Sequence, residues 1–358
     1  MILAGGVGSR FWPLSTRERP KQLLPLVSER PLIADTVARA RSLVPDARLR
    51  ILAGAHLVAP FRRVLPDIPE RCYLVEPEAR GTCPVLAWAA REILLHDPEA
   101  VMVSLHADHL IRPARKFLET IASAVETARR HEMLVTVGVT PDRIETGFGH
   151  IQPGEALDET PAAPRRVAAF HEKPDAPTAR RYMGQGYLWN TGIFVWQAET
   201  FLDEISGHAP EITHALSAAT TPPQDDAGRA PPGHEGRATA DATAFFREVP
   251  PCTVDEAVLE RSRRVAVVRA DFEWDDVGSF EALTRTRATD AGGNVIEGDC
   301  RVVEGRGNVV FADQGRVVLF GVDDTVVVRT GDVTLVMPRA RAPDLKALLS
   351  RLEEEGDR

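Results

Sequence analysis

A glycine-rich run stands directly after the first apolar residues of the chain. Residues 2–4 read Ile-Leu-Ala and lead into Gly5, Gly6 and Gly8. Glycines at such a place let backbone N–H groups approach a phosphate or a nucleobase without a Cβ in the way. No Gly-Lys-Ser/Thr follows, which argues against a P-loop, and a bare Gly-x-Gly is also common in plain strand-to-helix turns. We interpret the run as a candidate phosphate-binding turn.

Two cationic side chains follow these glycines. Arg10 stands next to the turn, and Lys21 comes eleven residues later within Pro20-Lys21-Gln22. One cation at the turn and a second on the following loop are placed to hold a triphosphate from two sides.

Two acidic segments further along the chain suit metal or phosphate chemistry. Asp108 follows the apolar run 101–105, at the carboxyl end of an expected parallel strand, where open α/β sheets bind ligands. Asp275 and Asp276 lie in an expected turn between a strand and a helix. Carboxylates from two distant loops, together with phosphate oxygens, commonly hold Mg²⁺. The residues alone leave open which of Asp275 and Asp276 takes part, and a solvated or helix-capping aspartate is the ordinary alternative.

His106 and His109 flank Asp108 in a His-x-x-His pattern. Imidazoles beside a carboxylate also occur in zinc and iron sites, so this segment offers an alternative to magnesium.

Composition and charge narrow the function classes. With 358 residues, of which 44% are hydrophobic and 27% charged, the chain is long enough for one large domain and a smaller one. The net charge of −9 offers no broad positive surface to a nucleic-acid backbone, so we expect no nucleic-acid partner. The cysteines, Cys72, Cys83, Cys252 and Cys300, form no Cys-x-x-Cys pair, and reduced thiols in a cytoplasmic protein are the simplest interpretation.

The sequence shows no sign of export or membrane insertion. No uncharged apolar stretch approaches the roughly 20 residues of a membrane helix, and no basic region followed by an apolar one opens the chain. Because the glycines come so soon after Met1, the first strand would be only a few residues long, which leaves open a native start upstream of Met1.

The alternation of apolar runs predicts the fold. Runs typical of buried strands, at residues 49–53, 72–75, 101–105 and 133–139, alternate with helical patterns at 32–43, 82–95 and 114–130. This order predicts an α/β, Rossmann-like domain with a mixed, mostly parallel sheet and helices on both faces. Residues 218–242 are rich in Thr, Pro, Gly, Asp and Ala without either period, and we expect a mobile surface insertion there.

The pattern changes after about residue 290. Short β-branched runs broken by Gly, Asp and Asn predict a small β domain, for which a few coils of β-helix are one option. Leucines at helical spacing in residues 343–355 predict a closing amphipathic helix. We therefore divide the chain into a catalytic domain, 1–288, and a β-rich domain, 289–358, that ends on this helix.

One long run near the N-terminus resembles the signature of the sugar nucleotidyltransferases, and of their mannose-1-phosphate guanylyltransferase branch in particular: LAGGVGSRFWPLSTRERPKQLLPL. Further blocks similar to that family follow in the expected order: EPEARGT (76–82), HADH (106–109), ETGFG (145–149), FHEKP (170–174), WNTGIF (189–194) and WDDVGSF (274–280). The resemblance covers the chain nearly completely to residue 285. The β tail resembles the short C-terminal domain of the same enzymes.

The resemblance implies roles for individual residues. Asp108 and Asp276 are implied as ligands of Mg²⁺ or another divalent cation, and Arg10 and Lys21 as the catalytic cations that hold phosphates. The implied nucleotide contacts are Leu3, Ala4, Gly5, Gly6, Gly8, Ser9, Arg10, Lys21, Glu76, Arg80, Thr82 and Asp108. The implied contacts to the sugar phosphate are Gly147, Glu172, Lys173 and Asn190. The chain departs from the usual family pattern at His106, where the family has Pro, and at Gly81, where it has Asn.

The activity that the resemblance implies is transfer of GMP from GTP to mannose 1-phosphate, giving GDP-mannose and pyrophosphate. The sugar phosphate is already anionic and attacks the α-phosphorus in line, so no general base is needed and positioning and charge stabilisation should dominate. Two alternatives stay open: another pair of sugar 1-phosphate and nucleoside triphosphate, and a non-catalytic regulatory relative. A dinucleotide oxidoreductase is disfavoured, because Arg10 stands close to where the third glycine of Gly-x-Gly-x-x-Gly belongs.

The resemblance also gives expectations for the organisation of the protein. Longer, bifunctional members carry an isomerase domain after the β tail, and this chain ends before one, so we expect a single activity. We expect GTP and mannose 1-phosphate as partners, a cytoplasmic location, and a homodimer through the C-terminal domain, since apolar strands at a sheet edge favour pairing.

Overall fold

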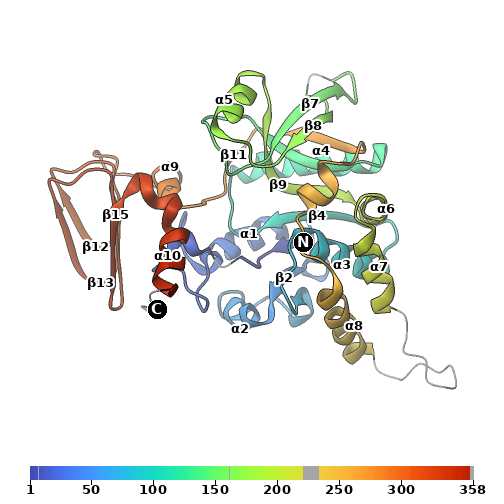
Figure 1. Ribbon diagram of the computed structural model, residues 1–358, viewed down its shortest axis with the longest axis horizontal. Coiled ribbons are helices and arrows are strands. Elements are labelled where there is room, and N and C mark those ends of the chain that lie inside the picture. The colour runs from blue at the N-terminus through green and yellow to red at the C-terminus, as the bar shows by residue number, and fades with distance from the viewer. Residues whose placement is uncertain (7, 161, 221–233, 355–358) are drawn as a thin grey trace.

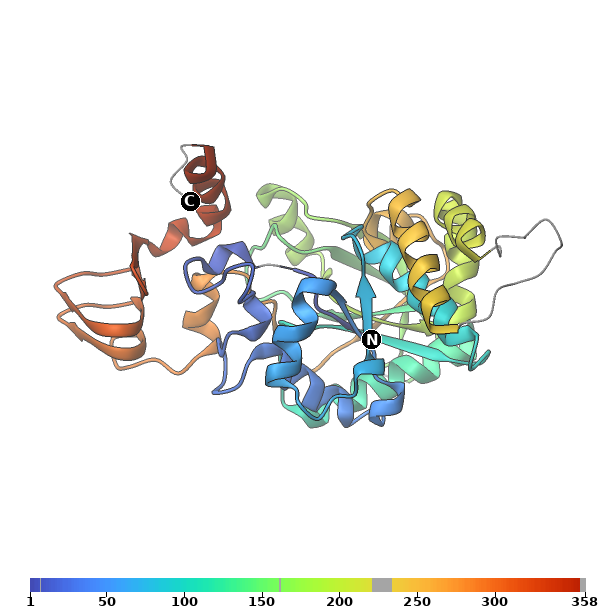
Figure 2. The same cartoon turned by 90° about the horizontal axis from the view of Figure 1, so that it is seen from below.

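The computed structural model describes residues 1–6, 8–160, 162–220 and 234–354 (Figure 1). A large α/β domain makes up most of the molecule, and a small β domain lies at one end of its long axis (Figures 1 and 2). None of the described helices is long and apolar enough to cross a membrane.

A nine-stranded sheet forms the centre of the large domain within the described residues. Its strands, in spatial order, are β3 (Tyr73–Glu76), β2 (Ile51–Gly54), β1 (Ile2–Leu3), β4 (Val101–His106), β9 (Leu188–Gln197), β6 (Leu134–Val139), β10 (Val265–Arg269), β8 (Arg165–His171) and β7 (His150–Ala156). Only β8 and β9 run against the common direction of these described strands. The predicted mixed, mostly parallel sheet is confirmed, and β1 lies inside it, between β2 and β4, although it has two residues.

Helices cover both faces of this sheet. On one face, α1 (Leu32–Arg41), α2 (Ala55–Val64) and α4 (Ala114–His131) bury their apolar stripes around Phe117. On the other face, the core around Trp88 joins α3 (Thr82–Leu94), α6 (Ala198–His208), α7 (Pro210–Thr220) and α8 (His234–Glu248). The strands between them are buried on both sides, which is why β6 reads as an uninterrupted run of buried residues.

Shorter elements connect these layers. They are α5 (Ala176–Gly184), α9 (Leu283–Thr286), the π-helical turn η5 (Asp255–Leu259), and the 3₁₀ turns η1 (Ser9–Phe11), η2 (Lys21–Leu23), η3 (Asp46–Arg48), η4 (Glu70–Cys72), η6 (Phe280–Ala282) and η7 (Arg339–Asp344). A separate two-stranded ribbon pairs β5 (Leu110–Arg112) with β11 (Glu273–Asp275), placing Asp275 opposite Leu110. This ribbon brings the turn after β11 to the loop that contains Asp108.

The C-terminal domain is a small stack of β coils. β12 (Val295–Val303), β13 (Val309–Phe320) and β14 (Thr325–Thr330) are parallel, and β15 (Val333–Pro338) pairs antiparallel with β14. Asn308 donates a side-chain hydrogen bond of 3.0 Å to Asn294, which ties two successive coils together. The chain then closes with α10 (Leu345–Glu354). A small β domain with a terminal helix is therefore confirmed, and it is built in the β-helical way.

A shared apolar core joins the two domains. Phe11 and Phe280 of the large domain pack with Val309, Val326 and Leu345 of the small one. The closing helix α10 therefore lies against η1, the turn that directly follows the glycine-rich run.

The segment 218–242 is partly described. α7 continues to Thr220 and α8 begins at His234, so both described ends are helical. Residues 221–233 lie outside the described residues, and the expected mobile insertion stays a prediction there. The sequence pattern does not predict α8, because Ala, Thr and Gly are frequent in its first half and its apolar residues show no helical period.

Candidate active site

The glycine-rich run forms a tight loop after β1 that only glycine can complete. Gly8 has a φ of 70°, and a Cβ on it would lie 2.2 Å from the Cβ of Lys21. Two side chains fix the loop: Gln22 donates to the Gly6 carbonyl at 2.7 Å, and Ser15 donates to the Gly8 carbonyl at 2.7 Å. The missing Cβ at residue 8 therefore allows Lys21 to pack directly on the loop.

Lys21 connects three segments that are far apart in the sequence. Its Nζ donates to Oδ2 of Asp108 at 3.0 Å and to the backbone carbonyl of Asp276 at 2.6 Å. Only 7% of the Lys21 side chain is exposed. An ammonium has three N–H donors, so one remains without a partner within the described residues.

The electrostatics around Lys21 leave an excess of negative charge. Burial alone would raise the pKa of Asp108, but Lys21 and the two flanking histidines lower it to about 2. Burial raises the pKa of Asp276 to about 6, against the pull of Lys21 and with help from Asp275, Asp108 and Glu145. One ammonium thus faces several carboxylates, a setting that favours a further cation.

The oxygen donors here fit a divalent cation. Asp108 and Asp276 come from different loops, and one ammonium contacts the carboxylate of Asp108 and the backbone carbonyl of Asp276. His106, Asp108 and His109 also place one ligand atom each within 4.8 Å of one another. However, Nδ1 of His109 accepts a hydrogen bond from the Trp274 indole N–H at 3.2 Å, and burial lowers the pKa of both imidazoles. A neutral His109 then carries its proton on Nε2, which argues against the histidine-ligated alternative.

Asp275 and Asp276 have different surroundings. The Asp275 side chain is buried, and its Oδ2 accepts from Arg285 at 3.0 Å and from Arg143 at 3.4 Å. Two guanidinium groups repel a metal ion, so Asp275 is a poor ligand. Asp276 lies by Lys21 and Asp108 with no ion pair of its own in the described residues, which favours Asp276 as the ligand.

A second cluster of polar groups surrounds Asn190, near the start of β9. Oδ1 of Asn190 accepts from the Thr136 hydroxyl at 2.7 Å, and its Nδ2 donates to Oδ1 of Asp255 at 2.9 Å. Glu172 lies close by, because a Cβ on Gly149 would stand 2.8 Å from its Oε2. Burial, with help from Glu172, raises the pKa of Asp255 to about 7.

Neighbouring residues complete this second cluster. Lys173 forms an ion pair with Glu172 and has a φ of 45°, in the left-handed region. The backbone N–H of Gly147 donates to Oε1 of Glu145 at 3.0 Å. His106 connects this region to the first cluster, since its Nε2 would lie 2.7 Å from a Cβ on Gly192. Gly147, Glu172 and Lys173 therefore lie on loops next to β7 and β8, and Asn190 lies on β9, which pairs with β7.

The predicted nucleotide contacts separate into two groups. Leu3 and Ala4 are buried in and after β1, and the exposed Arg10 follows Ser9 in η1 with no ion pair within the described residues. Glu76 ends β3 and faces the glycine loop, where a Cβ on Gly5 would lie 3.7 Å from its Oε1, and burial raises its pKa to about 7.

Arg80 and Thr82 are engaged elsewhere. Arg80 donates to the Phe246 carbonyl at 2.8 Å, and the hydroxyl of Thr82 accepts from the Val254 N–H at 3.0 Å. Gly81, with a φ of 87°, leaves room for the Cys252 carbonyl, which would lie 2.3 Å from a Cβ there. In this structure these residues hold the chain near residues 246–254 rather than facing the glycine loop.

Three residues of the site were not predicted from the sequence: Gln22, Glu145 and Asp255. Gln22 and Glu145 stand inside the family-like blocks, next to residues that were assigned roles, but their hydrogen bonds to loop backbone carry no sequence signal. Asp255 lies 65 residues from Asn190, and nothing in the sequence marks the π-helical turn that it begins. Such turns are frequent at functional sites.

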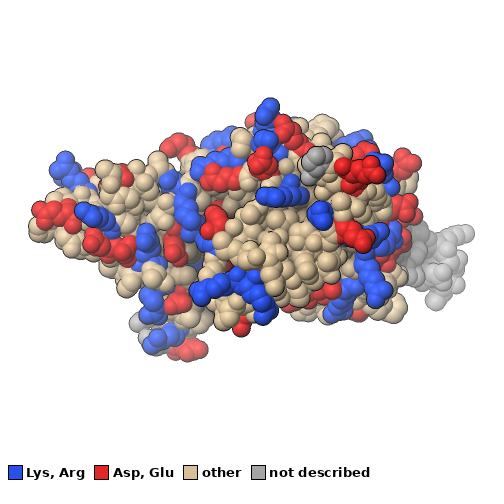
Figure 3. All heavy atoms as spheres, turned by 90° about the horizontal axis from the view of Figure 1, so that it is seen from above, with Lys and Arg blue, Asp and Glu red and all other residues tan. Residues whose placement is uncertain are grey.

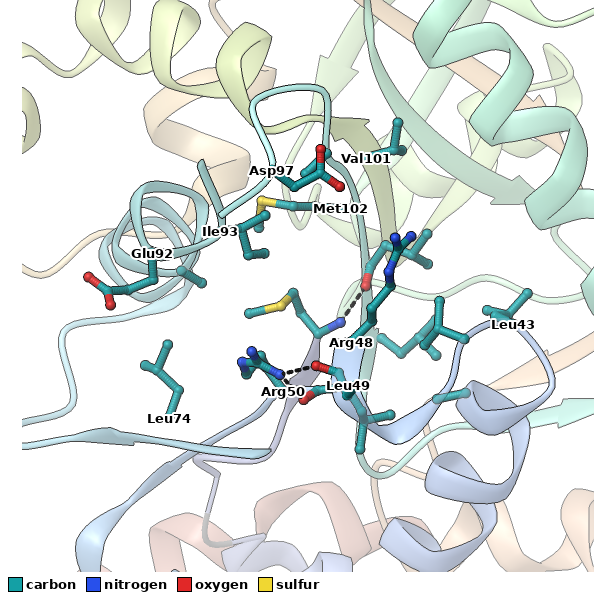
Figure 4. A pocket seen from close by; sticks show the side chains of 18 of the residues that line it. Leu43, Arg48, Leu49, Arg50, Leu74, Glu92, Ile93, Asp97, Val101 and Met102 are labelled. Atoms are coloured by element: carbon teal, nitrogen blue, oxygen red, sulfur yellow. Dashed lines mark hydrogen bonds between the residues drawn. The ribbon is translucent and has the colours of Figure 1, made fainter. Parts of the chain in front are cut away.

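A further cavity lies away from these clusters. It has a volume of about 1150 Å³ and opens at the amino ends of β1 and β4, among Glu92, Asp97, Arg48 and Arg50 (Figure 4). Burial lowers the pKa of the Met1 amino group there to about 5. None of the predicted catalytic residues lines this cavity, and we assign it no part in the chemistry.

Comparisons with known proteins agree with this geometry. The model of the nucleotidyl transferase family matches residues 1–292, and the MannoseP isomerase/GMP-like beta-helix domain model matches residues 293–352. The chain belongs to the nucleotidyl transferase family.

Relatives of this nucleotidyl transferase share most of its length. It is 35% identical over 357 residues to a mannose-1-phosphate guanylyltransferase of Klebsiella pneumoniae, covering 99% of this chain and 74% of that protein. It is 32% identical over 358 residues to the alginate biosynthesis protein AlgA of Pseudomonas aeruginosa, covering 99% and 72%. A crystal structure described as mannose-1-phosphate geranyltransferase from Thermus thermophilus has a TM-score of 0.85 and 31% identity, covering 98% of both chains.

The raised pKa of Asp255 predicts a pH dependence of stability. The folded nucleotidyl transferase binds this proton more tightly than the unfolded chain does, so the stabilisation is present below the ordinary pKa and is lost as pH rises towards 7. Between pH 5 and pH 8, Asp255→Asn should therefore lose less unfolding free energy than the wild type, by roughly 1–3 kcal/mol, measured by urea denaturation. Asp332→Asn, at an exposed turn, should follow the wild type. An equal loss of unfolding free energy in Asp255→Asn and the wild type would contradict a raised pKa of Asp255.

Proposed function

We propose that this nucleotidyl transferase joins GTP and mannose 1-phosphate to give GDP-mannose and pyrophosphate. The observation that carries the proposal is the Lys21 ammonium, which holds Asp108 and the Asp276 turn together beside the glycine-rich loop. Relatives named mannose-1-phosphate guanylyltransferase, at 35% identity over nearly the whole chain, support the same substrates. A charge-stripped regulatory relative is disfavoured, since every charged group of the predicted site is present.

The chain's own residues would act mainly by positioning and charge. The glycine loop exposes backbone N–H groups to the triphosphate, and the remaining Lys21 N–H and the exposed Arg10 neutralise its phosphates. The phosphate of the sugar attacks the α-phosphorus in line, its P–O bond forms as the bond to the pyrophosphate oxygen breaks, and no proton has to be removed. Asp108 and Asp276 would hold the divalent cation, proposed as Mg²⁺, which when bound lowers the repulsion between the two phosphates.

Glu76 offers a means of selecting guanine. Guanine presents two adjacent N–H donors on its base-pairing edge, and a carboxylate accepts two hydrogen bonds side by side. Glu76 is nearly buried at the glycine loop, and within the described residues it has no hydrogen bond that would compete. Adenine presents an acceptor where guanine has its ring N–H, so the same carboxylate would disfavour ATP.

The Asn190 cluster offers contacts for the sugar. Glu172 and Asp255 are acceptors for hydroxyl groups, Asn190 is held between Thr136 and Asp255, and Lys173 supplies a cation for the sugar phosphate. This cluster lies beside the Asp108 segment through the contact of His106 with Gly192. A sugar 1-phosphate bound here would have its phosphate directed towards the proposed metal site.

We also propose a cytoplasmic location, a division of the chain at residues 288 and 289, and a homodimer through the β domain. Basic and acidic side chains are interspersed on the face shown in Figure 3, in keeping with the expected absence of a nucleic-acid partner. The dimer is supported by exposed apolar side chains on one face of the β12–β13 pair, where Val303 is opposite Phe320 and Val318 is two residues away.

The substrates can be tested by measuring pyrophosphate release with Mg²⁺. GTP, ATP, UTP and dTTP are each paired with mannose 1-phosphate and with glucose 1-phosphate. We expect GTP with mannose 1-phosphate to give the highest kcat/KM, and Asp276→Asn to lower it by about 10² to 10³-fold because the metal loses a ligand. Preference for another pair would move the protein to a sister specificity, and no turnover with any pair would contradict the proposal.

The same assay tests whether Glu76 selects the guanine base. Glu76→Gln replaces one acceptor by a donor, so the preference for GTP over ATP should fall by about 10 to 100-fold while kcat with GTP changes less. An unchanged preference would show that Glu76 does not select the base.

The dimer can be tested by light scattering coupled to size-exclusion chromatography. Phe320 is 67% exposed, and Phe320→Ser should weaken dimerisation by at least about 10-fold. Leu95 is 69% exposed on the large domain, and Leu95→Ser should leave the dimer intact. A monomeric wild type, or equal effects of both substitutions, would contradict this interface.

A further inference from the structure

Asp275 is a buried carboxylate with both oxygens engaged. Its Oδ1 accepts from the Val277 N–H at 2.8 Å. Its Oδ2 accepts from Nη2 and Nε of Arg285 at 3.0 and 3.3 Å, and from Nη2 of Arg143 at 3.4 Å. A carboxylate surrounded in this way is fixed in orientation and is shielded from a cation by two guanidinium groups.

The first oxygen holds the turn that presents Asp276. Val277 is β-branched and has a φ of 48°, a conformation that costs free energy and persists only where surrounding contacts enforce it. The hydrogen bond from Val277 to Asp275 is such a contact. The Asp276 carboxylate in turn accepts from the Gly278 N–H at 3.1 Å, and its carbonyl faces Lys21. The orientation of Asp276 therefore depends on the carboxylate next to it.

The second oxygen reaches the loop of the proposed sugar site. Arg143 lies over the Trp189 ring at 4.8 Å and forms an ion pair of 3.6 Å with Oε2 of Glu145. Oε1 of Glu145 accepts from the Thr146 and Gly147 N–H groups, both at 3.0 Å. A continuous chain of contacts thus runs from Asp275 through Arg143 and Glu145 to the backbone of Gly147.

We propose that Asp275 is a positioning residue that fixes the Asp276 turn and the loop 143–147 in one arrangement. The inference rests on the proposed function, because the two segments are the proposed metal site and sugar site. Asp275 acts through Asp276 and Arg143 and binds neither metal nor substrate. Arg285 holds the same oxygen from α9, so the short segment that leads to the β domain is fixed to this point as well.

The first test measures metal binding without catalysis. Mn²⁺ binding to the whole protein is followed by electron paramagnetic resonance of the free ion. Asp275→Asn can still accept from Val277 but loses the charge that holds both arginines, and we expect Mn²⁺ binding to weaken by about 10-fold. Asp276→Asn should abolish it. Asp142→Asn, which removes an exposed partner of Arg143 at 3.0 Å, should bind Mn²⁺ as the wild type does.

The second test uses kinetics with the substrate pair that the wild type turns over fastest. Asp275→Asn should raise the KM for the sugar phosphate by about 10-fold and lower kcat, while a purely structural role would change the thermal midpoint alone. Arg143→Gln should raise the same KM, and the double variant should be no worse than the more affected single variant, because both act through one chain of contacts. If Asp275→Asn does not fold, the KM of Arg143→Gln for the sugar phosphate tests the proposal by itself.

The outcomes separate this inference from the proposed function. Loss of Mn²⁺ binding in Asp275→Asn equal to that in Asp276→Asn would make Asp275 a ligand and overturn the inference. Unchanged Mn²⁺ binding and KM in Asp275→Asn, or an unchanged KM in Arg143→Gln, would overturn it as well. A wild type that turns over no substrate pair but binds Mn²⁺ in the expected order of variants would contradict the proposed function and leave the positioning role supported.

Discussion

The buried ammonium of Lys21 is the interaction on which the site depends. It joins the loop after β1, the carboxyl end of β4 and the turn after β11 through two hydrogen bonds, to Asp108 and to the Asp276 carbonyl. Removing it would leave the Asp108 carboxylate, which is only 25% exposed, without its cation, a costly state. The glycine at residue 8 admits the Lys21 side chain, since any Cβ there would overlap it. Loop conformation, cation and carboxylates thus form one unit.

The rest of the fold keeps these three segments in register. The parallel strands deliver the glycine loop, Glu76 and Asp108 to one edge of the sheet, and the β5–β11 ribbon brings the Asp276 turn to the same place. The β domain packs on Phe11, directly after the glycine loop, and on Phe280, directly after the Asp276 turn. The small domain therefore stabilises the glycine loop and the Asp276 turn by packing on the residues that follow them, although none of its own residues is assigned to the chemistry.

The strands and helices that the sequence predicts correctly are those that a local pattern of apolar residues specifies. The strands at 101–106 and 134–139 and the helices at 82–94 and 114–131 are uniform apolar or periodic segments, and their observed ends lie within a few residues of the expected ones. The resemblance named Lys21, Asp108 and Asp276, and the structure brings them together. It could not foresee the partners of Asp275, the pair of Asn190 with Asp255, or the diversion of Arg80 to the end of α8. The contacts of Asn190 and Arg80 join segments 65 and 166 residues apart in the sequence. The contacts of Asp275 depend on two arginines that donate to the same carboxylate oxygen.

The most direct test of this account is the rate of pyrophosphate release by Lys21→Met at saturating GTP, mannose 1-phosphate and Mg²⁺. Met keeps the bulk that packs on Gly8 but removes the charge that contacts the Asp108 carboxylate and the Asp276 carbonyl. If the ammonium organises the site, kcat falls by about 10² to 10³-fold in a protein that still unfolds cooperatively. A kcat within about twofold of the wild type would contradict the central role of Lys21.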